Sequence, residues 1–172
     1  MRSKIGLFID EDSDGELIEM LENTLRLTET DMTIFFRNLA NIPKNMTIKD
    51  SDLSGLNYVI DAFYKPEELK DTIIEKWKSW MKAYIERLQL EGLTDEDRMQ
   101  EMNKVNPKYV LRNYMAQMAI DKADNGDYTL IDELYLLLQK PYDEQDKMEK
   151  WFAKRPEWAR NKVGCSKLSC SS

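Results

Sequence analysis

Residues 66–92 read PEELKDTIIEKWKSWMKAYIERLQLEG and carry the longest helical pattern in the chain. Large apolar side chains recur there at intervals of three and four residues, which places them along one face of a helix. Pro66 suits the first turn of a helix, and Gly92 is typical of the position where a helix ends. The apolar positions are Ile73, Trp77, Trp80, Met81, Tyr84 and Leu88. The stretch predicts one long helix whose aromatic stripe belongs to a core rather than to a ligand platform.

Shorter segments on both sides of this stretch have the same helical spacing. Thr30 or Asp31 is a candidate N-cap, Thr94 is another, and Asn106 is predicted to cap a helix that Pro107 opens. No segment alternates with the period of two that strands require, so we predict an all-α fold that forms a single multi-helix unit. The further predicted helical segments are residues 15–27, 30–42, 56–65, 94–105, 107–127, 128–140 and 142–162.

The same spacing predicts which side chains lie inside the protein. We expect one helical domain over residues 1–160, followed by a flexible tail rich in Cys and Ser over residues 161–172. The side chains that we predict to be buried include Phe35, Leu39, Trp77, Trp80, Tyr84, Leu111, Met115, Leu134 and Leu137.

Composition limits the classes of function. The 172 residues have a net charge of −7, which disfavours binding to nucleic acid. No apolar run approaches the roughly 18 residues that span a bilayer, and the first residues lack the pattern of a secretory signal. We therefore expect no membrane partner and a cytoplasmic protein, or a mitochondrial one in a eukaryote. With no histidine in the chain, a Cys/His zinc site is excluded.

An acidic stretch near the start resembles part of a calcium-binding loop. Asp10, Asp12, Asp14 and Gly15 fit the first positions of an EF-hand loop. That loop needs a bidentate carboxylate at its twelfth position, where this chain has Leu21. We interpret the stretch as an acidic helix start, with calcium binding as the minor alternative, and assign no metal ligand.

Motifs for nucleotide chemistry are missing from the sequence. It contains neither of the Gly-rich phosphate loops GxGxxG and GxxxxGK[ST], no GxSxG elbow, and no kinase-type catalytic segment. Phosphoryl chemistry needs a phosphate cradle and carboxylates that hold metal ions. We therefore assign no catalytic residue and no cofactor-binding residue to this chain.

Several stretches resemble the C-terminal part of the selenoprotein O family. The most specific block is NPKYVLRNYMAQMAI over residues 106–120, and the resemblance extends over essentially the whole chain. The other matching stretches are KIGLF (4–8), DMTIFFRNLA (31–40), WMKAYIERL (80–88), KPYDEQ (140–145), RPEWA (155–159) and SCSS (169–172).

The resemblance implies a pseudokinase, with a protein-kinase-like fold, that acts as a protein adenylyltransferase. Such enzymes transfer AMP from ATP to Ser, Thr or Tyr hydroxyls of other proteins with the help of magnesium. The family's nucleotide-binding and metal-binding residues all precede the position of Ile5. The chain thus resembles the helical C-terminal third of such a protein, without cofactors of its own. Its expected partners are the missing N-terminal kinase-like part and the family's protein substrates, and whether the chain alone is an enzyme stays open.

Cys165 and Cys170 are the only cysteines, and both lie in the last nine residues, GCSKLSCSS. The resemblance implies that Cys170 stands where other members carry selenocysteine, and that it pairs with a cysteine of the kinase-like part. We therefore name Cys170 and Cys165 as candidate redox residues. A disulfide between the two and a pair of ordinary reduced thiols remain alternatives. For the whole chain, the alternative function is an autonomous helical interaction module without nucleotide chemistry.

Overall fold

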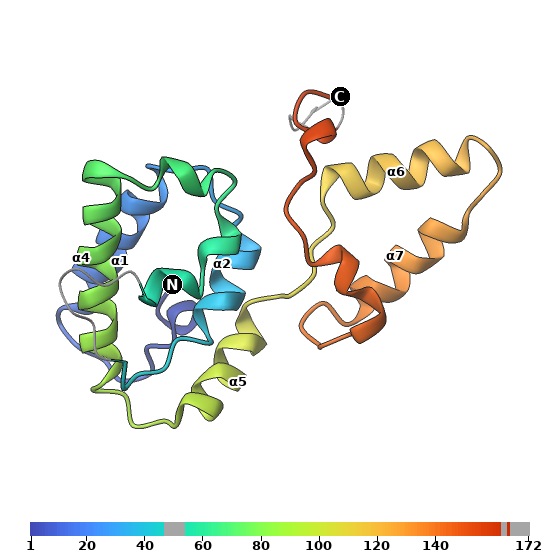
Figure 1. The fold of residues 1–172 in the computed structure, drawn as a ribbon. Coiled ribbons are helices and arrows are strands. Elements are labelled where there is room, and N and C mark those ends of the chain that lie inside the picture. Colours follow the sequence, from blue (N-terminus) through green and yellow to red (C-terminus); the bar gives the residue numbers. More distant parts are fainter. Residues whose placement is uncertain (47–53, 163–164, 166–172) are drawn as a thin grey trace. The chain divides into compact units, whose positions relative to one another are not determined.

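The computed structural model describes residues 1–46, 54–162 and 165, and it is helical (Figure 1). The predicted all-α class is confirmed: within the described residues, the extended pairing is limited to one isolated bridge between Thr30 and Phe63. None of the helices in this part of the chain combines the length and the apolarity that a bilayer span requires.

Contacts divide the chain into two compact units, Met1–Asn106 (unit 1) and Pro107–Ser172 (unit 2). The sequence did not predict this division. The predicted border between a helical domain over residues 1–160 and a tail over 161–172 stays a prediction, because most of that tail lies outside the described residues.

Unit 1 is built around the long helix α4, which packs beside α1, and α2 contacts the short N-terminal helix η1 (Figure 1). Helix α5 also packs on η1 and brings the end of the unit back to its beginning. The α-helices are α1 (Asp14–Leu25), α2 (Met32–Leu39), α3 (Ser54–Asn57), α4 (Asp71–Leu88) and α5 (Asp95–Val105). The 3₁₀ helices are η1 (Arg2–Ile5), η2 (Ile60–Ala62) and η3 (Pro66–Glu68).

The predicted helix over residues 66–92 is shorter than the pattern indicated. Pro66 opens the separate turn η3, and Lys70 is extended, with φ of −141° and ψ of 170°, before α4 begins at Asp71. The prediction that Pro66 lies in the first turn of the long helix is therefore wrong. The predicted helix over residues 56–65 is likewise divided between α3 and η2.

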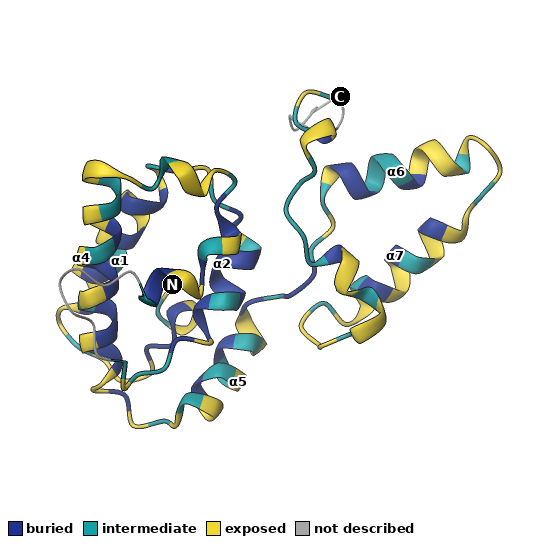
Figure 2. Cartoon of the chain, in the orientation of Figure 1, coloured by how far each residue is buried: buried dark blue, intermediate teal, exposed yellow. Residues whose placement is uncertain are grey.

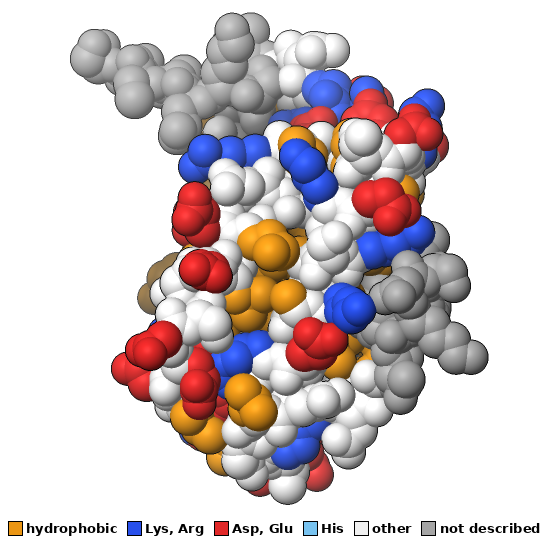
Figure 3. Space-filling view, turned by 90° about the vertical axis from the view of Figure 1, so that its left-hand side faces the viewer, with side chains coloured by type: hydrophobic (Ala, Val, Ile, Leu, Met, Phe, Trp, Pro, Cys, Tyr) orange, Lys and Arg blue, Asp and Glu red, His pale blue; other side chains and the backbone are white. Residues whose placement is uncertain are grey.

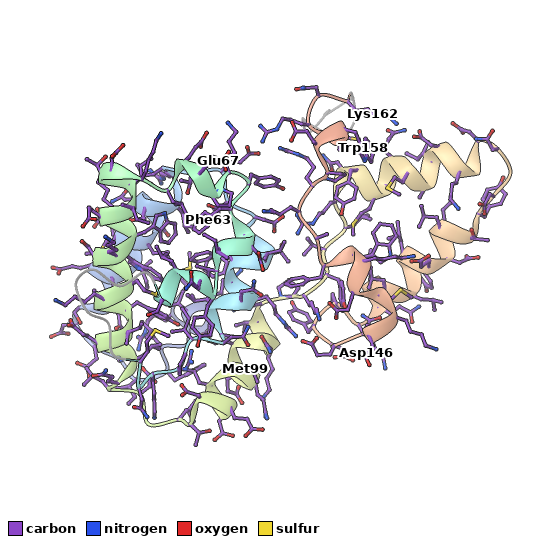
Figure 4. All side chains as sticks on the ribbon, viewed as in Figure 1. Phe63, Glu67, Met99, Asp146, Trp158 and Lys162 are labelled. Atoms are coloured by element: carbon purple, nitrogen blue, oxygen red, sulfur yellow. The ribbon has the colours of Figure 1, made fainter. Side chains whose placement is uncertain are left out.

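The aromatic stripe of α4 forms the centre of unit 1, as predicted. Trp77, Trp80 and Tyr84 have no exposed surface, and Figure 2 shows the buried face of α4 turned towards the rest of the unit. The Trp80 and Tyr84 rings stack with centroids 4.9 Å apart. Phe63 meets Trp77 edge-on at 5.1 Å and points into the interior of the unit (Figure 4). The interpretation of this stripe as core is confirmed.

Polar groups at two helix starts act as predicted, and a third does not. The Asp31 side chain accepts a hydrogen bond from the Ile34 amide at 3.1 Å, and Thr94 caps α5 in the same way. Asn106 instead ends α5, and its side-chain amide donates to the Lys4 carbonyl oxygen at 2.8 Å. The prediction that Asn106 caps a helix opened by Pro107 is wrong.

Unit 2 begins with an extended segment rather than with a helix. The amides of Lys108 and Tyr109 both donate to the carbonyl oxygen of Pro141, at 2.8 and 3.0 Å. This pairing holds residues 108 and 109 away from helical geometry, so the helix starts only at Asn113. The elements of unit 2 are α6 (Asn113–Ala123), α7 (Thr129–Gln139), η4 (Asp146–Trp151) and η5 (Glu157–Ala159).

The core of unit 2 lies between α6, α7 and the later 3₁₀ helices. Met115, Leu134 and Leu137 are buried there, as predicted, together with Trp151 and Ala159. Lys162 contributes at the surface: its ammonium group lies over the Trp158 ring and bonds Asp121 of α6 at 2.7 Å (Figure 4).

Gly6 occupies a position that only glycine fits. Its φ is +75°, and an added Cβ would lie 2.7 Å from the Met102 sulfur and 3.2 Å from Arg98 carbons. Both side chains are fully buried, so they can make room for a Cβ only by disturbing the packing around them. We expect Gly6→Ala to lower the free energy of unfolding of unit 1 by about 2 to 3 kcal/mol, from left-handed strain and overpacking.

Gly126→Ala is the matched control for this prediction. Gly126 has nearly the same φ, +78°, but no atom lies within 4 Å of an added Cβ. The control should lose only about 1 kcal/mol, from backbone strain. Urea unfolding is followed by amide exchange in α5 for Gly6→Ala and in α7 for Gly126→Ala. Equal losses of free energy of unfolding in the two variants would contradict the crowding at Gly6.

Candidate functional site

The predicted redox residues lie at the end of unit 2. Cys165 carries a free thiol that is buried in the core of unit 2, the same cluster as Trp151 and Ala159. Cys170 lies outside the described residues. Thiol exchange requires access to the sulfur, and an apolar core denies it. The geometry therefore gives Cys165 the character of a packing residue.

The acidic stretch that resembles a calcium loop is engaged by arginines. The Asp14 carboxylate lies 2.6 Å from the Arg87 guanidinium and 3.0 Å from that of Arg2. Asp10 also pairs with Arg2. Within residues 1–46, 54–162 and 165, no three acidic or Cys side chains come together as a metal site. Asp14 thus has a structural role, which the sequence pattern did not indicate.

Arg87 is the centre of a buried polar cluster that sequence reasoning missed. Its guanidinium donates to Asp14, to Glu91 at 2.9 Å and to the Ile9 carbonyl oxygen at 2.8 Å. The Glu91 carboxylate accepts from the amides of Phe8 and Ile9, at 3.1 and 3.3 Å. We call Arg87, Asp14 and Glu91 the Arg87 cluster. It fastens the segment before α1 to the end of α4.

The charges of the Arg87 cluster stabilise one another. Burial alone raises the pKa of Asp14, but hydrogen bonding and attraction from Arg87, helped by Arg2, outweigh it and lower that pKa below its ordinary value. Burial likewise lowers the pKa of Arg87, and the two carboxylates reverse this and raise it. Asp14 and Arg87 are therefore both charged at neutral pH.

The lowered pKa of Asp14 predicts acid sensitivity. The unfolded chain binds a proton at Asp14 more readily than the folded one, so this group's contribution is complete above the ordinary pKa of about 3.9 and is lost as pH falls through the folded value. We expect the free energy of unfolding of unit 1 to fall as the pH drops from about 5 to about 2, and the fall to be smaller in Asp14→Asn. Urea titrations at several pH values measure it. An unchanged fall in Asp14→Asn would contradict the assignment.

A second buried charge lies in unit 2. Lys108 pairs with Glu144 and Glu149, and its ammonium group lies 5.2 Å from the centre of the Phe152 ring. Burial lowers the pKa of Lys108, and the hydrogen bonds that its ammonium group donates to the two glutamates outweigh this and raise it. The pairing joins the extended segment before α6 to η4 and gives Lys108 a structural function.

Unit 2 also has an apolar groove between its two helices. The groove has a volume of about 530 Å³, and Leu111, Ala119, Ile120, Ile131, Leu134 and Tyr135 are among its lining residues. We call it the α6–α7 groove. Leu111 is 54% exposed, so the prediction that it is buried is wrong. It lies in the extended segment before α6 and borders the groove instead of entering the core.

Unit 1 has a more polar hollow between α1 and α4, of about 410 Å³. Figure 3 views the protein from the side of unit 1 that carries α4 and shows apolar side chains at the centre of that face, with charged ones around them. Met20 contributes the apolar lining, and Glu16, Glu19 and Lys76 supply charges of both signs. Two carboxylates against one ammonium group leave the lining of the hollow with an excess of one negative charge, which disfavours an anion.

Comparison with known proteins identifies the family. A family model described as protein adenylyltransferase SelO matches residues 1–139. Protein nucleotidyltransferase YdiU of Flavobacterium johnsoniae is 58% identical over 170 residues, 99% of this chain and 32% of that protein. The YdiU proteins of Rhodopirellula baltica and Aromatoleum aromaticum are 45% and 43% identical, and each match covers 100% of this chain and 33% and 31% of the relative. The chain spans about a third of the length of these relatives. Its match to the family model over most of its length shows that it belongs to the SelO family.

Proposed function

We propose that this chain is the C-terminal helical part of a protein adenylyltransferase and supports a catalytic part that holds the nucleotide. In the reaction, a Ser, Thr or Tyr hydroxyl of a protein attacks the α-phosphorus of ATP, AMP is transferred, and pyrophosphate leaves. The observation that carries the proposal is the match of nearly the whole chain to only about a third of each relative.

ATP and magnesium are assigned to the catalytic part. Magnesium sites in such enzymes use carboxylates with free oxygens. The buried carboxylates among the described residues do not fit that role, because Asp14 and Glu91 are both hydrogen-bonded to Arg87 and Asp31 accepts a hydrogen bond from the Ile34 amide. The sequence also has no Gly-rich loop to surround a triphosphate. What this chain supplies, on this proposal, is a helical support whose own polar groups are committed to its fold.

Mass spectrometry after incubation with ATP and magnesium tests the proposal. The chain alone should acquire no AMP. A chimera in which this chain replaces the matching third of the F. johnsoniae relative should transfer AMP to a protein. The amount of AMP that the intact relative transfers is the reference for this measurement. An AMP adduct on the isolated chain, or a folded chimera that transfers none, would overturn the proposal.

We also propose that the redox function belongs to Cys170. Oxidation would join its sulfur to a second thiol, and a disulfide oxidant such as oxidised glutathione would accept the two electrons and two protons. The burial of Cys165 supports this choice, because only an accessible thiolate exchanges readily. Native chain treated with oxidised glutathione should form a mixed disulfide that Cys170→Ser loses and Cys165→Ser keeps. Modification confined to Cys165 would contradict it.

The alternative function, an autonomous helical interaction module without nucleotide chemistry, is favoured by one observation. The α6–α7 groove offers an apolar surface of the kind that receives a partner. The chimera separates the two functions, because an autonomous module has no effect on AMP transfer. The expected location in the cytoplasm, or in mitochondria of a eukaryote, stays a prediction.

A further inference from the structure

The α6–α7 groove gathers large apolar side chains at the surface of unit 2. Tyr135 is 66% exposed, Leu111 54% and Ile120 52%, and Ile131 is also exposed. Single exposed apolar residues are normal on protein surfaces, but a contiguous set in a concave site marks a surface that another molecule covers. The groove is therefore a candidate interface.

Helices α6 and α7 are apolar on two sides. On one side, Met115 and Leu137 pack with Trp151 of η4 and Ala159 of η5. On the other side lies the groove, and Figure 2 shows exposed and buried positions following one another along α7. A helix that is apolar on more than one face is typical of the inside of a larger structure. Leu111 fits this view. Its sequence pattern predicts burial, yet it borders the groove and remains exposed in this chain.

Charges around the groove are already used within unit 2. Asp121 bonds Lys162 at 2.7 Å, and Lys122 bonds Asp127 at 3.0 Å. Asp124 is the charged residue among those that line the groove in the described part of the chain. Recognition there must rest on apolar contact, so the occupant presents an apolar surface.

The extent of the family match indicates what that occupant is. The family model ends at residue 139, and Gln139 is the last residue of α7, so both helical walls lie inside the matched segment. The relatives share these walls with the chain but extend over about three times its length. An occupant common to the family is therefore the remaining two-thirds of the same polypeptide, rather than a partner peculiar to one organism.

We propose that the α6–α7 groove receives an apolar surface of the catalytic part in the complete polypeptide. This inference rests on the proposed function, since that function requires a catalytic part. It adds the place of contact. Tyr135, Leu111 and Ile131 then become buried interface residues when the polypeptide is complete.

Hydroxyl-radical labelling tests the proposal on the free chain and on the F. johnsoniae chimera. Tyr135 should react readily in the free chain and lose reactivity in the chimera, down to the level of Tyr84, which is buried in unit 1. Tyr128 is exposed, lies in the same unit and does not line the groove, so it serves as the comparison. Protected amides in α4 and in α7 show that units 1 and 2 are both folded in the two proteins.

Two charge substitutions give a matched second measurement. Tyr135 and Leu136 are adjacent on α7 and similarly exposed, at 66% and 57%, but only Tyr135 lines the groove. Tyr135→Glu should lower the melting temperature of the chimera and not that of the free chain, whereas Leu136→Glu should leave both unchanged. Equal effects of the two substitutions in the chimera would count against the groove.

The outcomes distinguish this inference from the proposed function. Tyr135 that stays as reactive in a folded chimera as in the free chain overturns the interface, whether or not the chimera transfers AMP. Tyr135 that is protected in a chimera without transfer supports the interface and overturns the function. If the chimera does not fold, the chain is labelled in a mixture with the rest of the relative as a separate polypeptide, and unchanged reactivity of Tyr135 there overturns the interface.

Discussion

Arg87→Met should lower the free energy of unfolding of unit 1 by about 3 to 5 kcal/mol, because it removes the guanidinium that pairs with both buried carboxylates and leaves Asp14 to Arg2. The side chains of Arg87, Asp14 and Glu91 are 5%, 4% and 1% exposed, so water cannot replace the lost guanidinium. The hydrogen bond to the Ile9 carbonyl oxygen is lost as well. Methionine retains most of the volume, so the loss reports charge rather than a cavity.

An exposed ion pair provides the control for this result. Lys104 and Glu101 lie 2.6 Å apart on α5, with side chains 66% and 45% exposed. Lys104→Ala should cost less than about 1 kcal/mol, because solvent screens the pair and holding two long side chains together has an entropic cost. Urea unfolding at pH 7, followed by amide exchange in α4, compares the two variants.

A combined variant separates the unpaired charges from other causes. If buried carboxylates cause the loss, then Asp14→Asn and Glu91→Gln added to Arg87→Met should recover part of the stability, because they remove the uncompensated charge. The three losses should therefore be far from additive. An Arg87→Met protein that unfolds like Lys104→Ala would show that the cluster contributes nothing.

The local sequence pattern was sufficient to predict the core of unit 1. The spacing of Trp77, Trp80 and Tyr84 fixes one face of α4, and an apolar face of that width has to be buried. The cap at Asp31 could also be predicted, because its chemistry involves only residues within one turn. Features that depend only on residues close together in the sequence can thus be predicted without a structure.

Features that depend on distant residues could not be predicted. Pro107 suggests a helix start, but the amides that follow it donate to the carbonyl oxygen of Pro141, more than thirty residues along the chain. Asn106, whose side chain is suited to a helix cap, bonds Lys4 instead. Each competing partner lies far away in the sequence, and the pattern around Pro107 contains no trace of it.

The candidate sites show the same limit. Asp14 belongs to a stretch that resembles a calcium loop, yet its partner Arg87 lies on another helix. The only local signal for the cluster was the spacing of Arg87 and Glu91, which puts both on one face near the end of α4. Leu111 was predicted to be buried from the helical spacing of its segment, which the structure shows to be extended at that point. Its exposure in the α6–α7 groove is what the proposed contact with a catalytic part would explain.

Trp80→Ala should destabilise unit 1 by about 3 to 5 kcal/mol, since it removes a large, fully buried ring and leaves a cavity. The ring stacks on Tyr84 within α4, and its N–H donates to the Leu17 carbonyl oxygen of α1 at 3.2 Å, so the variant loses a stack inside α4 and a hydrogen bond between α4 and α1. Trp158, which is about half exposed, provides a control of the same residue type in unit 2.

Trp158→Ala should cost only about 1 kcal/mol, because an exposed ring loses little burial and its edge-on contact with Tyr114 contributes on that scale. Trp80→Phe should fall between the two alanine variants, since a phenyl ring retains part of the stack but not the hydrogen bond. Urea unfolding monitored by amide exchange in α1 and α4 measures unit 1 directly. If Trp80→Ala left those amides as protected as Trp158→Ala does, then α1 and α4 would not be held together by this ring, and the aromatic stripe would not be the centre of the unit.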